Sequence, residues 1–147
     1  MKKRIDINKY IGKWYEIAKI PSAFEPELYN VTAEYTLNND GTITVVNTGY
    51  TDNKEISIDG KISIKGIAKL TNKDDLLMVS FFKGLESEYN ILAITEDYQY
   101  ALVGGESPNY LWILGRKNII PASIYNYFKE VAIEHAYNIE KLTINKN

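Results

Sequence analysis

Residues 55–68 read EISIDGKISIKGIA, in which every even-numbered position is apolar or glycine and most odd-numbered positions are polar. Alternation with a period of two is typical of a β-strand that buries one face and exposes the other. The stretch therefore predicts a single long strand. Gly60 and Gly66 fall on its apolar face, where a strand bends or admits a close neighbour.

Seven further segments rich in β-branched and aromatic residues lie at short intervals on either side of this stretch. Turn sequences separate them, for example Asn-Asn-Asp-Gly at residues 38–41. Such closely spaced strands are typical of an antiparallel barrel or sandwich. We expect eight barrel strands, at residues 14–20, 31–37, 42–50, 55–68, 76–82, 89–95, 98–104 and 110–116, and a short final strand at 139–144. Closing the sheet removes its edges, and the interior of eight strands holds side chains or one small ligand.

One segment follows a helical period instead. Its apolar residues have the spacing i, i+4, i+7, i+8 and are Ile124, Phe128, Val131 and Ala132. This spacing predicts an amphipathic helix over residues 121–136, with Pro121 at its first position and Asn138 ending the following turn. The whole chain, 1–147, is thus expected to be one all-β domain: an eight-stranded antiparallel up-and-down barrel (12–117), one C-terminal α-helix (121–136) and a final strand (139–144).

Composition narrows the range of functions. The chain has 147 residues, a net charge of −2 and no cysteine. A balanced charge predicts no nucleic-acid partner, and the lack of cysteine excludes thiolate chemistry and disulfides. The one histidine, His135, stands at the end of the predicted helix with no second ligand beside it. We therefore expect no catalytic residue, no metal site, no cofactor and no enzymatic activity.

The N-terminus, Met-Lys-Lys-Arg, resembles the basic front of a signal peptide, but no apolar segment follows it. No stretch approaches 18 consecutive apolar residues, so the sequence predicts no transmembrane helix. A periplasmic or outer-membrane-associated location is expected if a leader was removed. A cytoplasmic location is expected if the chain is complete as written.

Three short motifs fall at the ends of predicted strands. They are Gly12-Lys13-Trp14 at the start of the first strand, Thr95-Glu96-Asp97-Tyr98 between the sixth and seventh, and Arg116 at the end of the eighth. In this order and spacing they resemble the three signature motifs of the lipocalins. Residues 8–144 are similar to the branch that contains the bacterial lipocalins and apolipoprotein D. The absence of cysteine favours the bacterial members, because animal members of that branch use disulfides.

Arginine is scarce in this chain, since only Arg4 and Arg116 stand against 15 lysines. At the closed end of the barrel, a planar guanidinium can stack on the indole of Trp14 and donate hydrogen bonds to backbone carbonyls at once. Lysine lacks this planar fork. We therefore predict a structural role for Arg116, with direct contact to a ligand as the alternative.

The resemblance implies a binding protein whose barrel holds a small hydrophobic ligand, such as a fatty acid or lysophospholipid. Strand parity then predicts the inward residues. With Trp14 inward, Glu16, Ala18 and Ile20 follow, and with Arg116 inward, Leu114 follows. The predicted ligand contacts are Tyr35, Asn47, Trp112, Tyr110, Ala33, Val45, Val79, Phe81 and Glu16. Most are apolar or aromatic, which suits an apolar ligand with one polar end.

Some of these residues have a second interpretation. A carboxylate at Glu16 facing an apolar lumen would have a raised pKa unless a structural partner holds it. A buried amide at Asn47 needs a partner, which a ligand or a water could supply. The loop 21–30, with Phe24, Leu28 and Tyr29, could form a lid, touch a membrane surface or simply pack on the barrel. The alternative function is a protein-interaction or self-associating module whose barrel is filled by its own side chains, and peripheral membrane association and oligomerisation stay open.

Overall fold

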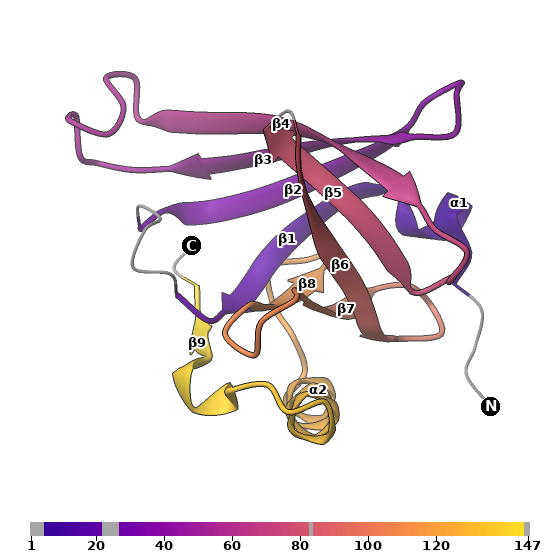
Figure 1. Ribbon diagram of the computed structural model, residues 1–147. Coiled ribbons are helices and arrows are strands. Elements are labelled where there is room, and N and C mark those ends of the chain that lie inside the picture. Colours follow the sequence, from indigo (N-terminus) through magenta and orange to yellow (C-terminus); the bar gives the residue numbers. More distant parts are fainter. Residues whose placement is uncertain (1–4, 22–26, 83, 146–147) are drawn as a thin grey trace.

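The computed structural model describes residues 5–21, 27–82 and 84–145. Eight antiparallel strands follow one another along the chain, and each pairs with the next. Because β1 pairs with both β2 and β8, the sheet closes into a barrel (Figure 1). This confirms the predicted all-β up-and-down barrel. The strands are β1 (Gly12–Lys19), β2 (Tyr29–Leu37), β3 (Ile43–Tyr50), β4 (Lys61–Leu70), β5 (Leu76–Phe82), β6 (Leu85–Ile94), β7 (Tyr100–Gly104) and β8 (Leu111–Gly115).

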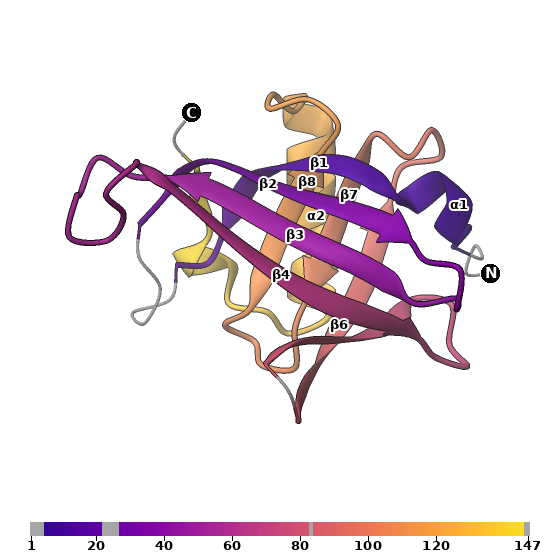
Figure 2. The same cartoon turned by 90° about the horizontal axis from the view of Figure 1, so that it is seen from above.

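The two ends of the barrel differ. A short helix that the sequence analysis did not predict, α1 (Ile7–Tyr10), lies at the end where β2 turns into β3 (Figure 2). We call this the closed end. The other end, where β3 turns into β4 and β7 into β8, is the open end. The side chain of Asp6 caps α1 by accepting a hydrogen bond from the Asn8 N–H at 3.0 Å, which satisfies one free donor of the first turn.

The second helix, α2 (Ala122–Glu134), packs on the outside of the barrel beside β7 and β8 (Figure 1). It buries the predicted apolar stripe in a cluster that includes Phe128, Val131, Ala132, Leu102 and Ile113. The helix is confirmed, with two local differences. Pro121 is the N-cap rather than the first helical residue, and Ala136, with φ of +64°, takes the left-handed conformation after the helix, where Asn138 was expected to end the turn. No helix of the described segments is long and apolar enough to cross a membrane.

The predicted final strand 139–144 is only partly correct. Its first half forms a 3₁₀ helix, η1 (Ile139–Lys141), and only β9 (Thr143–Ile144) is extended. β9 pairs with β1 on the outside of the barrel, with Ile144 opposite Ala18. It uses the edge of β1 that β2 leaves free near the open end.

The predicted strand 55–68 is wrong in its first part, because β4 begins at Lys61. Residues 53–60 form turns instead, in which the Asn53 carbonyl accepts hydrogen bonds from the N–H groups of Ile56 and Ser57. The side chain of Ile58 is 89% exposed, so the alternating pattern there buries nothing. Asp59 and Ser57 bond to their local backbone, and Gly60 has a φ of +79°, a conformation that glycine adopts without strain. Local turn chemistry therefore overrides the period-two pattern.

Candidate ligand-binding site

The closed end is organised by Arg116, as the sequence analysis predicted. Its guanidinium carbon lies 3.8 Å from the ring centroid of Trp14, so the two planes stack. The guanidinium also donates hydrogen bonds of 2.9–3.2 Å to five backbone carbonyls, those of Lys9, Tyr10, Ile11, Lys13 and Tyr98. Three of these acceptors belong to α1 and the residue that follows it. Arg116 therefore ties the N-terminal segment to the barrel.

The other two motifs support this arrangement. Gly12 has a φ of +106°, and a Cβ there would lie 3.2 Å from the Arg116 guanidinium, so glycine allows the close approach. In the turn between β6 and β7, the Thr95 hydroxyl donates to the Asp97 carboxylate at 2.7 Å. Tyr98 adopts the left-handed conformation, with φ of +56°, and its hydroxyl accepts from the N–H of Asp6 at 2.9 Å. The three motifs therefore meet around α1.

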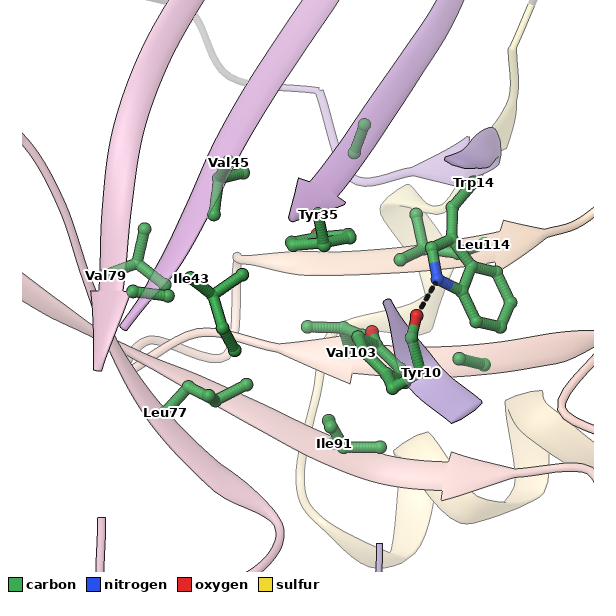
Figure 3. Packing of buried hydrophobic residues seen from close by; sticks show 13 residues of the cluster. Tyr10, Trp14, Tyr35, Ile43, Val45, Leu77, Val79, Ile91, Val103 and Leu114 are labelled. Carbon is green, nitrogen blue, oxygen red and sulfur yellow. Dashed lines mark hydrogen bonds between the residues drawn. The ribbon is translucent and has the colours of Figure 1, made fainter. Parts of the chain in front are cut away.

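Next to α1, the closed half of the lumen is packed with side chains (Figure 3). The predicted inward residues Ala33, Tyr35, Val45 and Val79 are all buried there, which confirms their parity. The space left among them is a cavity of about 10 Å³. A space of this size holds at most one water molecule.

Three tyrosines meet in this closed half. The Tyr89 hydroxyl hydrogen-bonds both the Tyr10 hydroxyl, at 2.5 Å, and the Tyr35 hydroxyl, at 2.8 Å. Burial raises the pKa of Tyr35 to about 12 and also raises the pKa of Tyr10 and Tyr89 well above their usual value. All three therefore stay neutral hydroxyls at physiological pH. Sequence reasoning found only Tyr35, because Tyr10 lies on the unpredicted helix and Tyr89 had no motif to mark it.

Near the open end, a β-bulge changes which residues of β1 face inward. The pairing of β1 with β8 shifts between Glu16, opposite Leu114, and Ala18, opposite Ile113. The predicted inward positions Ala18 and Ile20 are therefore wrong, and both pack in the outer cluster against α2. Lys19, opposite Trp112, faces inward instead. Parity counting missed this because a bulge adds one residue to one strand.

The bulge brings opposite charges together on the inner wall. The Lys19 ammonium lies 3.9 Å from the Glu16 carboxylate, and both side chains are mostly buried. The Asn145 amide donates to the same carboxylate at 2.8 Å. Glu16 thus has structural partners, which agrees with the alternative in which such a partner holds its carboxylate. One of them comes from the residue after β9, which no local sequence pattern could predict.

Aromatic and polar residues follow on the open half of the inner wall. Trp112 is half-buried and faces inward, as predicted. Tyr110 was expected inside the lumen, but it lies just before β8 and is 47% exposed, because the chain is already turning at the rim. Its ring stacks on Trp112 with centroids 6.5 Å apart. Phe81 is half-buried and lies over Gly66, where a Cβ would come within 2.6 Å of its ring.

Asn47 is another polar group on this wall. It is half-buried on β3, between Ala33 and Ile64 in the register, and shares the inward parity of Val45. Its side-chain amide makes no hydrogen bond with any described residue, and because no buried polar side-chain atom of the described residues lacks a partner, this amide is open to solvent. Two N–H donors and a carbonyl acceptor are therefore available to a molecule that enters from the open end.

Other candidate features are accounted for differently. The His135 ring contacts the Val131 carbonyl at 2.9 Å within its own helix turn, and no three acidic or histidine side chains of the described residues gather as a metal site. The loop predicted as a lid or membrane contact lies partly outside the described residues, including Phe24. Of its other members, Leu28 packs on Gly49, and the Tyr29 hydroxyl donates to Asp52 at 3.0 Å.

Comparison with protein families agrees with this geometry. The family model of the lipocalin-like domain matches residues 5–147. The chain belongs to the lipocalin family. Lipocalins bind or carry ligands and are not enzymes, which agrees with the absence of a predicted catalytic site.

Three relatives from different kingdoms match most of this lipocalin. Outer membrane lipoprotein Blc of Vibrio cholerae is 36% identical over 140 residues, covering 93% of this chain and 80% of that protein. Temperature-induced lipocalin-1 of Arabidopsis thaliana is 37% identical, covering 95% and 78%. Apolipoprotein D of Mus musculus is 36% identical, covering 97% and 77%.

Solved structures support the fold. The cockroach allergen Per a 4 superposes with a TM-score of 0.74 at 23% identity, covering 97% of this chain and 88% of that one. Lobster apocrustacyanin A1 gives a TM-score of 0.74 at 16% identity, covering 95% and 78%. At these identities the comparison concerns the barrel and its outer helix alone.

Proposed function

We propose that this lipocalin binds a small hydrophobic ligand of the fatty acid or lysophospholipid class through the open half of its barrel. The observation that carries the proposal is the partly exposed inner wall of that half, where Ile64 is 38% exposed and Asn47 is half-buried, next to side chains that are sealed. Apolar surface left in contact with water costs free energy, and a bound acyl chain removes this cost by covering the surface. The polar end of such a ligand then lies toward the open end.

The neighbouring residues fit such a ligand. Trp112 and Phe81 offer aromatic surface on the inner wall, and Glu16 and Lys19 offer one charge of each sign close to the rim. Binding transfers apolar surface from water to this wall, at about 0.8 kcal/mol per buried methylene before ordering costs. The lipid class is supported by the name of one relative, apolipoprotein D.

The test is a calorimetric titration of delipidated protein with oleate and with its lysophospholipid counterpart, followed in parallel by tryptophan emission. Micromolar, saturable binding is expected. Because Trp14 is fully buried under Arg116, the emission change should come from Trp112. Trp112→Phe should lose the emission change but keep most of the binding heat. Trp112→Ala should weaken binding about tenfold or more, whereas Tyr127→Ala, on the exposed face of α2, should not.

Asn47→Leu removes the polar group while keeping the side chain about the same size. Because Asn47 lies two residues from the sealed level of Val45, an acyl chain covers its amide, and the variant should bind both oleate and the lysophospholipid at least as tightly as the wild type. A folded protein that takes up neither ligand would refute the proposal.

One observation favours a second candidate function, a module for protein interaction or self-association. The closed half of the barrel is already filled, with a cavity of only about 10 Å³. If no lipid binds, sedimentation velocity over a range of concentrations would show whether the chain associates with itself. In the binding proposal the ligand lies between this filled half and the open end, so the closed half does not have to be empty.

The proposal includes a location at the bacterial cell envelope. Two bacterial relatives of this chain, from Vibrio cholerae and Escherichia coli, are outer membrane lipoproteins. Fractionation of cells that make the full-length gene product tests the location directly. Recovery in the membrane or periplasmic fraction supports it, and recovery in the cytoplasm contradicts it.

A further inference from the structure

The inner wall changes from sealed to accessible at one level of the barrel. On β3 the side chain of Val45 is 2% exposed, while Asn47, two residues nearer the open end, is half-buried. On β4 Ala68 is 1% exposed and Ile64 is 38% exposed. On β5 the same step separates buried Val79 from half-buried Phe81, which is two residues nearer the open end. Three neighbouring strands thus mark one boundary across the lumen.

A layer of three tyrosines lies in the sealed part. Tyr10 comes from α1, Tyr35 from β2 and Tyr89 from β6, so the layer joins three separate elements. Their ring centroids are 5.7, 6.0 and 6.4 Å apart, and their hydroxyls are joined by the two hydrogen bonds described above. All three line the cavity of about 10 Å³, together with aliphatic side chains of the strands. We call these residues the tyrosine floor.

The floor is anchored on more than one side. Tyr10 cannot leave the lumen without moving α1, and Arg116 holds the carbonyls of Lys9, Tyr10 and Ile11. Moving Tyr89 breaks both hydroxyl hydrogen bonds, which join it to the buried side chains of Tyr10 and Tyr35. A chain of methylenes offers no hydrogen bond in return. The floor is thus a barrier for an acyl chain and not a loosely packed region that such a chain displaces.

We infer that the tyrosine floor limits how deeply a ligand enters the barrel and so selects the length of its buried apolar chain. The inference rests on the proposed function. Between Val45 and Tyr50, β3 rises about 17 Å, which corresponds to about 13 Å along the barrel axis at the usual strand tilt. The buried part of an extended chain is therefore expected to reach about ten carbons, with the remainder at the open end.

The test is a series of saturated fatty acids from 6 to 18 carbons, titrated by calorimetry below their critical micelle concentrations. Kd should fall by up to about fourfold per added methylene and then become constant near ten carbons. Tyr89→Leu removes the ring of the half-buried member of the floor and should move the plateau to chains at least two carbons longer. Tyr89→Phe keeps the ring but loses the two hydroxyl bonds that anchor it, and it should move the plateau by less than Tyr89→Leu does.

A second pair of variants covers the case in which Tyr89→Leu does not fold. Val45→Ala removes two methyl groups at the boundary itself and should lengthen the plateau, whereas Val46→Ala, on the outer face of the same strand, should not. Affinity that keeps rising to 18 carbons in the wild type, or a plateau that no inward variant moves, would overturn the depth limit while leaving the proposed function standing. A folded wild type that binds no chain of any length would overturn both.

Discussion

Replacing Arg116 by lysine keeps the charge and removes the planar fork, so it tests how the closed end is held. The guanidinium donates to five backbone carbonyls and stacks on Trp14 at 3.8 Å. An ammonium on a shorter side chain can keep about two of these bonds. Discounting for the partial exposure of Arg116, we assign about 1 kcal/mol to each of three lost bonds and about 0.5 kcal/mol to the lost stacking. The expected loss of unfolding free energy is about 3–4 kcal/mol.

The measurement is urea unfolding followed by tryptophan emission, with a thermal melt in which Tm should fall by about 10 °C. Hydrogen exchange should also become faster at residues 7–11, because Arg116 holds the last turn of α1 through the carbonyls of Lys9, Tyr10 and Ile11. Lys117→Ala is the matched control, since Lys117 is adjacent and exposed, and its effect should stay within about 0.5 kcal/mol. An Arg116→Lys variant as stable as this control would refute the reasoning that the guanidinium hydrogen bonds hold α1.

The remaining predictions concern the core and the corrected strand. Since burial raises the pKa of Tyr35 to about 12, its stabilising contribution is complete below pH 10 and falls as the pH rises toward 12, by up to about 1.4 kcal/mol per pH unit. Urea midpoints at pH 9, 10 and 11 should show this slope, and it should be shallower in Tyr35→Phe. Gly66→Ala should destabilise the fold by about 1–3 kcal/mol in chemical unfolding, because its Cβ would lie 2.6 Å from the Phe81 ring, and an unchanged midpoint would contradict this contact. Phe128→Ala should cost about 3–5 kcal/mol, since the ring is fully buried between α2 and the barrel, and a loss below 1 kcal/mol would contradict that burial. Ile58→Ser should change stability by less than about 0.5 kcal/mol, whereas a buried strand position would lose several times more.

The comparison of sequence and structure is most informative at β1. Parity placed Trp14 and Glu16 on the inner wall, and the register confirms both. It failed from Ala18 onward because the bulge shifts the pairing by one residue, which puts Lys19 inside. A bulge depends on how β1 meets two neighbours at once, and no pattern within residues 12–19 records it. The inward position of Lys19 could therefore not be predicted from the sequence.

The floor of the lumen shows the same limit for a different reason. Tyr10, Tyr35 and Tyr89 are separated by 25 and 54 residues in the chain, and only barrel closure brings their hydroxyls together. Tyrosine is common in strands, so its presence did not distinguish a floor residue from an ordinary one. Nothing in the local sequence says that the closed half is filled while the open half is accessible.

By itself, the sequence determined the class of the fold, the outer helix and the role of Arg116, because each follows from local information. Period-two alternation, helical spacing and a single arginine at the end of a predicted strand can each be recognised from a few neighbouring residues. Only the tertiary structure decided which residues of β1 face the lumen, that three tyrosines meet in its closed half and which partners hold Glu16. These properties depend on register, a bulge and contacts between distant strands, which chain closure creates and local patterns do not encode.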